Sequence, residues 1–203
     1  MADRPLAAFD LDGTLTRRDT LLPFLLRACG LVQTAHALAA ASPLLARAAV
    51  LGGTHRDAAK AAVLERLLAG ESLAPLTETA ETYADDVVAR RLRRDVAARV
   101  EWHRREGHEL VLVSASPELY ATPIGRRLGF DAVLATRLEV GPDGRLTGRL
   151  VGANCRGAEK VARLREWCGT ERVLAYAYGD SAGDRELLAL AATAIRVSGH
   201  RPP

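Results

Sequence analysis

The chain has 203 residues, of which 48% are hydrophobic and 26% are charged, a composition typical of globular proteins that argues against intrinsic disorder. Its net charge of +3 is mildly basic, but aromatic residues make up only 4% of the chain and offer little surface for stacking bases, so nucleic acid is not the expected partner. The length allows one domain with an insertion, or two small domains.

The cysteines and the N-terminal residues bear on the compartment. Cys29, Cys155 and Cys168 are odd in number and have no Cys-x-x-Cys spacing, so neither a disulfide framework nor a zinc site is predicted. The first residues lack the architecture of a secretory signal peptide. The sequence therefore predicts a cytoplasmic location with reduced thiols.

The first apolar run, residues 6–9, predicts a buried strand that ends at a pair of acids. Asp10 and Asp12 stand two residues apart and so point to the same side at the carboxyl end of this strand, where open α/β sheets bind ligands. Gly13 and Thr14 predict that the chain turns away from the sheet there. An Asp-x-Asp-Gly stretch is also typical of an ordinary turn, so its interpretation depends on residues later in the chain.

Residues 28–46 contain no Asp, Glu, Lys or Arg and consist mainly of Leu, Ala and Val. A membrane-spanning helix needs about 20 predominantly apolar residues. This run is interrupted by Gln33, His36 and Pro43 and ends at Arg47, so we predict no transmembrane segment. One or two Ala-rich helices are expected, and the alternative is a peripheral surface that lies on a membrane or touches a lipid tail.

A helical period continues after this run. Thr54 followed by Asp57 resembles a capping arrangement, and the helix that it would begin ends at Gly70. A second helix is predicted after Ser72, and a third ends at Gly107. The helices before residue 88 predict an α-helical insert that covers residues 17–88, and the third helix would belong to the core.

The hydrophobic period then changes to that of strands. Apolar runs predict four strands, separated mostly by helical stretches, at residues 110–113, 132–135, 173–178 and 193–197. The turn Gly141-Pro142-Asp143-Gly144 predicts a β-hairpin between residues 137 and 150. We therefore predict an α/β fold in which residues 1–16 and 89–203 form a core around a parallel sheet with right-handed crossovers.

Two further candidates follow strands or begin helices. Ser114 and Ala115 follow a predicted strand. A hydroxyl with adjacent backbone N–H groups at the start of a helix binds phosphate readily. The same residues are also typical of an ordinary helix N-cap. Lys160 begins a predicted helix, where an exposed lysine is the ordinary interpretation. Only it and Lys60 are lysines among 28 basic residues, so each is a candidate for a position that needs a compact ammonium.

A second acidic stretch, Gly179-Asp180-Ser181-Ala182-Gly183-Asp184, follows the third of these strands and brings two more carboxylates to the same edge of the sheet. Carboxylates gathered there would repel one another, which argues for a divalent cation, and oxygen-only ligands favour Mg²⁺ over zinc. Arg56 and Lys60 lie one helical turn apart and would meet an anionic substrate from the insert, although a solvated pair is equally typical.

These stretches resemble the four motifs of the haloacid dehalogenase (HAD) superfamily of phosphohydrolases. The resemblance is carried, in order, by Asp10-Leu11-Asp12-Gly13-Thr14, Ser114, Lys160 and the stretch from Gly179 to Asp184. The insert resembles the helical cap of subfamily IB, the branch that contains phosphoserine phosphatase. The resemblance implies a Rossmann-like core with an inserted α-helical cap and a Mg²⁺-dependent phosphomonoester hydrolase.

The resemblance also implies a role for each motif residue. Asp10 would be the nucleophile that forms an aspartyl-phosphate, Asp12 the general acid and base, and Lys160 the charge-balancing cation. Mg²⁺ would be bound by Asp10, Asp180 and the backbone carbonyl of Asp12. Substrate contacts are expected from Thr14, Ser114, Ala115, Arg56 and Lys60, and supporting roles from Asp184, Gly179 and Ser181. Carbon–halogen cleavage is disfavoured, because it needs neither the metal-binding acids nor an acid at position 12.

The expected substrate is a small phosphorylated metabolite or a phospholipid head group. Phosphoserine phosphatase proper is an alternative, but that enzyme typically carries Glu where this chain has Asp19 and Asn where it has Gly183. A phosphotransferase and a non-catalytic phosphate-binding regulatory module are further alternatives. The sequence does not reveal the oligomeric state.

Overall fold

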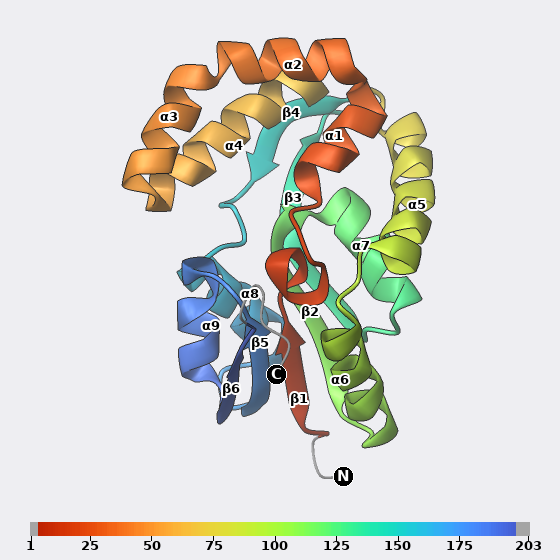
Figure 1. Ribbon diagram of the computed structural model, residues 1–203, viewed down its shortest axis with the longest axis vertical. Helices are drawn as coiled ribbons and strands as arrows, with labels where there is room; N and C mark the ends of the chain where they lie inside the picture. Colours follow the sequence, from red (N-terminus) through yellow and green to blue (C-terminus); the bar gives the residue numbers. More distant parts are fainter. Residues whose placement is uncertain (1–3, 198–203) are drawn as a thin grey trace.

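The computed structural model describes residues 4–197, which fold around a six-stranded sheet of order β4-β3-β2-β1-β5-β6 (Figure 1). All neighbouring strands are parallel except β3 and β4, which are antiparallel. The strands are β1 (Leu6–Phe9), β2 (Glu109–Pro117), β3 (Ala132–Val140), β4 (Leu146–Val151), β5 (Leu174–Gly179) and β6 (Thr193–Arg196). The predicted α/β fold with a mainly parallel sheet is confirmed.

Helices cover both faces of the sheet, because alternate strand residues point to opposite sides. Ala7 and Phe9 of β1 belong to one apolar cluster, and Leu6 and Ala8 belong to another. The first cluster packs under α6 (Arg94–Arg105) and α7 (Glu118–Arg127), and the second packs under α8 (Ala158–Cys168) and α9 (Arg185–Leu190). All four residues of β1 are buried, so the strand that carries the first motif lies in the middle of the core.

The predicted hairpin is present, but its first strand is longer than the apolar run indicated. Strand β3 pairs with β2 in parallel and then continues to Val140, where it pairs with β4 in the antiparallel direction. Its turn is closed by a hydrogen bond from the backbone N–H of Gly141 to the carbonyl of Arg145 at 2.7 Å. An apolar run does not predict this extension, because only the first part of β3 pairs with β2 in the parallel sheet, and the residues after 135 are more polar.

Five helices occupy the predicted insert: α1 (Leu21–Cys29), α2 (Leu31–Ala40), α3 (Ser42–Leu51), α4 (Gly53–Leu68) and α5 (Leu73–Arg90). Figure 1 shows α1 to α4 as an arch above the carboxyl ends of the strands. The uncharged run forms the end of α1, all of α2 and the start of α3, which confirms the expected Ala-rich helices. The division of the chain at residues 17 and 88 stays a prediction, and α5 continues two residues beyond it.

The predicted capping by Thr54 and Asp57 is wrong. Helix α4 begins at Gly53, because Gly52 and Gly53 both adopt positive φ angles and turn the chain there. The side chain of Asp57 instead accepts a hydrogen bond from Asn154 Nδ2 at 2.6 Å. Helix α4 lies close to β4, since a Cβ at Gly148 would lie 2.9 Å from Glu65 Cα.

Within residues 4–197, no single helix has the length and apolar composition needed to cross a bilayer. Helices α2 and α3 together reach that length and composition, but they are bent by 65°.

A buried histidine links α6 to the sheet. The ring of His103 has no exposed surface, and its Nδ1 lies 2.7 Å from Nδ1 of His108 while its Nε2 lies 3.0 Å from the hydroxyl of Tyr178. Burial, together with the charges of His108 and Arg99, lowers the pKa of His103 from 6.5 to about 4. The folded protein therefore holds this ring neutral at a pH where an exposed histidine is protonated.

This shift predicts acid destabilisation. Between pH 6.5 and about pH 4 the unfolded chain binds a proton that the folded chain does not, so the free energy of unfolding should fall by a total of about 3 kcal/mol as the pH is lowered through this window, and His103 should contribute no further loss below it. Urea unfolding across the window measures the loss. His103→Gln, which cannot titrate, should have a shallower pH dependence than the wild type, and equal slopes would contradict the assignment.

Candidate active site

The first motif lies where β1 ends. Asp10 follows the last strand residue, and residues Leu11–Leu15 form a single wide helical turn, η1, which is interrupted at Gly13 with a φ of 80°. A Cβ at Gly13 would lie 2.2 Å from Oδ2 of Asp180, so glycine is needed here both for the backbone angle and for the approach of that carboxylate. The turn thus places Asp10 and Asp12 beside the acidic stretch that follows β5.

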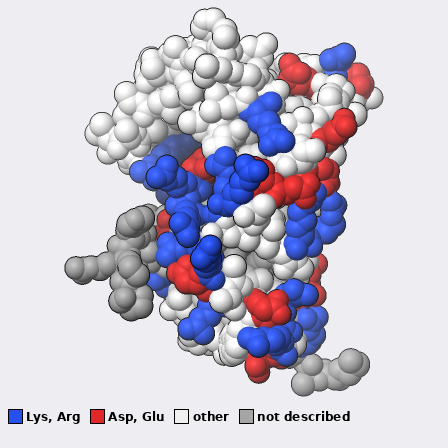
Figure 2. Space-filling model, turned by 45° about the vertical axis from the view of Figure 1, so that its right-hand side comes forward, with Lys and Arg blue, Asp and Glu red and all other residues white. Residues whose placement is uncertain are grey.

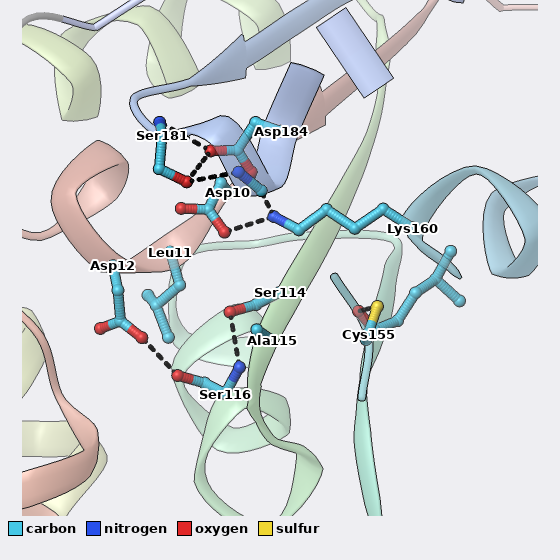
Figure 3. Close-up of polar contacts among 12 residues, drawn as sticks. Asp10, Leu11, Asp12, Ser114, Ala115, Ser116, Cys155, Lys160, Ser181 and Asp184 are labelled. Atoms are coloured by element: carbon cyan, nitrogen blue, oxygen red, sulfur yellow. Dashed lines mark hydrogen bonds and ion pairs between the residues drawn. The ribbon is translucent and has the colours of Figure 1, made fainter. Parts of the chain in front are cut away.

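Lys160 lies between two carboxylates in the interior of this site (Figure 3). Its Nζ is 2.5 Å from Oδ1 of Asp10 and 2.6 Å from Oδ1 of Asp184. Lys160 and Asp184 are 1% exposed and Asp10 is 6% exposed. The side chain reaches this position from the first turn of α8, so the predicted exposed alternative for this lysine is excluded.

Burial and charge act against each other in this cluster. Burial alone would lower the pKa of Lys160, but the charges of Asp10 and Asp184 raise it above its usual value. Burial raises the pKa of Asp10 to about 7, and the adjacent ammonium only partly offsets this shift. For Asp184, Lys160 and the hydrogen bonds from Ser181 outweigh burial and lower the pKa. Lys160 is therefore charged, and Asp10 depends on its cationic surroundings to stay ionised.

Asp12 points away from this cluster toward Ser116 (Figure 3). Its Oδ1 accepts hydrogen bonds from the backbone N–H and the hydroxyl of Thr20, both at 2.7 Å, and its Oδ2 accepts one from the hydroxyl of Ser116. The Ser116 hydroxyl in turn accepts from Tyr120 at 2.9 Å. Burial and the charge of Asp19 raise the pKa of Asp12 to about 6, although the hydrogen bonds oppose the shift. A carboxyl group with this pKa can gain and lose a proton near neutral pH.

The donor set fits a divalent cation. Asp10, Asp180 and Asp184 each offer a carboxylate oxygen, and these oxygens lie within 4.8 Å of one another. Oδ1 of Asp180 is buried and has no hydrogen-bond partner among the described residues, which is costly for an ionised carboxylate unless a cation approaches it. Both carboxylate oxygens of Asp184 already have partners, Lys160 and Ser181, whereas Lys160 contacts only one oxygen of Asp10, so Asp10 and Asp180 fit the cation best.

Ser181 holds Asp184 in place, and Gly179 leaves room for it. The backbone N–H and the hydroxyl of Ser181 both donate to Oδ2 of Asp184, at 3.0 and 2.9 Å. A Cβ at Gly179 would lie 2.5 Å from the Cβ of Asp184. These contacts leave the other oxygen of Asp184 directed at Lys160.

The prediction that Ser114 opens a helix is wrong. Strand β2 continues through Ser114 to Pro117, and α7 begins only at Glu118. A register shift between Ser114 and Pro117 allows this extension, with Pro117 paired to Thr136. Ser114 Oγ accepts a hydrogen bond from the N–H of Ser116 at 3.0 Å. Ser114 is therefore held by the strand end itself and not by a helix N-terminus.

Of the other two residues predicted to contact substrate in the core, Thr14 is buried in η1 and its hydroxyl has no hydrogen-bond partner within residues 4–197. The carbonyl of Ala115 accepts hydrogen bonds from Lys60 and from the hydroxyl of Thr136. The hydroxyl of Thr14 is therefore available to donate a hydrogen bond, whereas the carbonyl of Ala115 already accepts two.

Lys60 connects the insert to the core. Its Nζ donates to the carbonyl of Ala115 in β2 and to Oδ1 of Asn154, 2.7 Å away in the loop before α8. Burial lowers the pKa of Lys60 to about 8. Arg56 lies one turn earlier on α4 with an exposed side chain, and it lines the same pocket as Lys60 and Asp19.

The sequence interpretation missed four residues of this site. Thr20, Ser116 and Tyr120 form the hydrogen-bonded surroundings of Asp12, and Asn154 receives Lys60. No spacing or composition signal marks Thr20 or Tyr120, because the tertiary fold alone brings them to Asp12. Ser116 and Asn154 stand close to the motif residues in the sequence, but their types alone do not indicate these contacts.

Known proteins resemble this chain over most of its length. A family model for haloacid dehalogenase-like hydrolases matches residues 7–189. Protein CicA from Caulobacter vibrioides is 39% identical over 186 residues, which cover 92% of this chain and 82% of that protein. Phosphoserine phosphatase SerB1 from Mycobacterium tuberculosis is 32% identical over 132 residues, which cover 64% of this chain and 42% of that protein.

Solved structures share the fold. A protein of unknown function from Bordetella pertussis Tohama I superposes with a TM-score of 0.79 at 31% identity, covering 95% of this chain and 89% of that one. A substrate-bound phosphoserine phosphatase superposes with a TM-score of 0.62 at 19% identity, covering 94% and 84%, and this likeness concerns the fold alone. The comparisons confirm the predicted kind of enzyme, a phosphatase-type hydrolase. Since the family model covers residues 7–189 and the relatives span most of the chain, this protein belongs to the haloacid dehalogenase-like hydrolase family.

Proposed function

We propose that this protein is a Mg²⁺-dependent phosphomonoesterase that acts through an aspartyl-phosphate on Asp10. The observation that carries the proposal is the buried contact of Lys160 with Asp10 and Asp184, beside an Asp180 oxygen that has no hydrogen-bond partner among residues 4–197. A buried lysine that balances two acids leaves an excess of negative charge, and this excess suits a metal ion. The carboxylates of Asp10 and Asp180 and the carbonyl of Asp12 would hold Mg²⁺, which would stabilise charge on the phosphoryl oxygens.

In the first step, a carboxylate oxygen of Asp10 attacks phosphorus in line with the leaving group. The ester P–O bond breaks, and the leaving oxygen takes the proton of Asp12. In the second step, ionised Asp12 removes a proton from water, the water oxygen attacks phosphorus, and the bond between phosphorus and Asp10 breaks to release inorganic phosphate. The pKa of about 6 that burial gives Asp12 suits a group that must be an acid and then a base.

Phosphoryl oxygens would be bound by Ser114 and Thr14. The hydroxyl of Ser114 already accepts a hydrogen bond from the Ser116 N–H, so its own proton is available to donate. The Thr14 hydroxyl is buried without a partner among the described residues, and a bound phosphate would satisfy it. Ala115 would contribute through its backbone N–H. Lys160 would balance charge as the transfer proceeds.

Residues 17–88 would act as a cap over this site. The contacts of Lys60 with Ala115 and Asn154 support the proposal, because they join the insert to the core beside Ser114. A closed cap excludes bulk water from the aspartyl-phosphate. Arg56 and Lys60 would meet the substrate from this side. The predicted cytoplasmic location rests on the sequence and stays a prediction.

The substrate would be a small phosphorylated metabolite or a phospholipid head group. Phosphoserine is not favoured. Phosphoserine phosphatase typically carries Glu at the position of Asp19, and Oδ1 of Asp19 instead accepts the backbone N–H groups of Leu21 and Leu22 and so caps α1. A regulatory phosphate-binding module without catalysis is also not favoured, because it would need neither Asp12 nor the hydrogen bonds that Asp12 accepts from Thr20 and Ser116.

Phosphate release with and without Mg²⁺ tests the proposal. Phosphoserine, histidinol phosphate, sugar phosphates, nucleotides and lysophospholipid phosphates are incubated with the protein, and then with excess EDTA. We expect release from at least one compound that EDTA abolishes and Mg²⁺ restores. No release in either condition would contradict the proposed activity, and a phosphorylated product formed with an added alcohol would identify a phosphotransferase.

The role of Asp12 predicts a dependence on the leaving group. Asp12→Asn should slow the hydrolysis of an alkyl phosphate by about 10²- to 10⁴-fold, because the alkoxide then leaves without a proton. The first-turnover release of p-nitrophenol from its phosphate should change much less, since that anion leaves unprotonated. Rapid-mixing kinetics separate the first turnover from the steady state. Asp143→Asn, on the exposed hairpin turn, is the matched control, and equal losses for both substrates would rule out the acid role.

A further inference from the structure

An apolar pocket of about 280 Å³ lies inside the predicted cap, among α1, α2, α3 and α4. Its walls are formed mainly by five leucines, two alanines and a valine. A pocket of this kind offers few hydrogen-bond partners, so burying a polar group in it would be costly. Its ligand should therefore be a hydrocarbon group.

The charged residues of the pocket connect it to the active site. Asp19, Arg56 and Lys60 complete its lining. The ammonium of Lys60 also donates to the carbonyl of Ala115, next to Ser114. Asp19 precedes Thr20, which binds the carboxylate of Asp12. A phosphomonoester with its phosphoryl group at Asp10 would therefore have this pocket beside its organic part, with Lys60 between the two.

The pocket is continuous with an apolar surface. Among residues 4–197, eight of the eleven large hydrophobic side chains that are exposed lie between Leu22 and Leu51. Leu31 is 72% exposed and Val50 is 84% exposed. Figure 2 shows a broad surface without charged side chains at the upper left of the molecule, and charged side chains appear to its right and below it. Leu22 and Leu45 belong both to this exposed set and to the pocket wall, so a hydrocarbon chain has an apolar path inward.

We propose that this pocket binds the hydrocarbon chain of an amphiphilic phosphomonoester, with the phosphate held at the active site. The proposal rests on the proposed phosphatase function for the position of the phosphate. Arg56 and Lys60 match an anionic head group, and the leucine-rich walls match a single chain. A small polar substrate would leave the pocket unused and its leucines without a partner.

Binding of n-alkyl phosphonates, which cannot be hydrolysed, tests the pocket separately from catalysis. Calorimetry with a series from butyl to dodecyl, in the presence of Mg²⁺ and below the micellar concentration, gives Kd for each length. We expect Kd to fall by about three- to fourfold for each methylene until the pocket is full. Ala48→Leu fills part of the pocket and should remove most of this dependence, whereas Ala49→Leu, the neighbouring exposed position on α3, should retain it.

Two results would overturn the proposal: a Kd that is independent of chain length, or identical behaviour of the two variants. Chain-dependent phosphonate binding without hydrolysis of the matching alkyl phosphates would support the pocket and contradict the phosphatase. Ethyl phosphate, which lacks a long chain, should be hydrolysed equally by the wild type and Ala49→Leu, which verifies that a substitution on α3 leaves catalysis intact. Dodecyl phosphate presented in phosphatidylcholine vesicles identifies the source of the chain: rates that follow its surface fraction indicate a bilayer, and rates that follow its bulk concentration indicate a soluble amphiphile.

Discussion

Asp10→Asn is expected to lower the rate of phosphate release by at least about 10⁴-fold, because the substitution replaces the attacking carboxylate with a group of the same size that is not nucleophilic. The amide oxygen can still accept the hydrogen bond that Asp10 Oδ1 accepts from Lys160, so the fold should be retained. Steady-state phosphate release at saturating Mg²⁺ measures the effect. Circular dichroism and the urea midpoint verify that the variant is folded.

The control for this loss is Asp143→Asn, which makes the same chemical change on the exposed hairpin turn and should leave turnover at the wild-type rate. A folded Asp10→Asn protein that turns over like this control would show that another group attacks phosphorus. An intermediate loss, with phosphate release still dependent on Mg²⁺, would instead point to a direct attack by water that Asp10 only assists.

Lys160→Met should cost about 3–5 kcal/mol of stability at neutral pH, because it leaves Asp10 and Asp184 facing each other in a buried site without their shared cation. Without the ammonium, the folded-state pKa of both acids lies above the unfolded value of 3.8. The folded variant then binds more protons than the unfolded chain, so its stability falls as the pH rises through the folded pKa values and returns as the pH is lowered. The difference from the wild type should therefore narrow in mild acid.

The other lysine provides a matched control. Lys60 donates to two neutral oxygens, those of Ala115 and Asn154, so Lys60→Met leaves no buried carboxylate unpaired. Its cost should be about 1–3 kcal/mol, with no recovery in acid. Urea unfolding of both variants over the same pH range measures the contrast. If Lys160→Met lost no more stability than Lys60→Met and showed no recovery, the charge balance inferred for the buried cluster would be wrong.

Much of the candidate site could be predicted, because its motif residues follow apolar runs that predict strands or are of a type that is rare in this chain. Asp10 and Asp180 directly follow short apolar runs, and parallel strands bring their carboxyl ends to one edge of a sheet. Lys160 was conspicuous because lysine is rare in this chain. The order of these residues along the chain matched the family, so the fold and the chemistry could be inferred together.

What could not be predicted depends on contacts between distant segments. The extension of β2 through Ser114 to Pro117 requires pairing with β3, which a local period does not indicate. The environment of Asp12 comes from Thr20 and Tyr120, which lie on separate helices or their flanks and meet only in the folded protein. The same holds for Asp57, whose acidity near a helix start suggested a cap, although it binds Asn154 across the structure.

In the insert, the helices could be predicted from the sequence, but the pocket among them could not. Its uncharged run predicted helices correctly, because composition and period are local properties. The pocket among α1 to α4 depends on how those helices cross, and no single helix carries the information. The proposed substrate preference therefore depends on tertiary packing, whereas the proposed reaction chemistry is indicated by short motifs.

The most direct test of the central claim is to locate the phosphoryl group on the enzyme during turnover. The protein is mixed with Mg²⁺ and a substrate from the phosphate-release screen, quenched in acid within the first turnovers, and digested for peptide mass spectrometry. The account predicts the added mass of one phosphoryl group on the peptide that contains Asp10, and its absence in Asp10→Asn. Rapid phosphate release with an unmodified Asp10 peptide, or with the phosphoryl group on another residue, would contradict it.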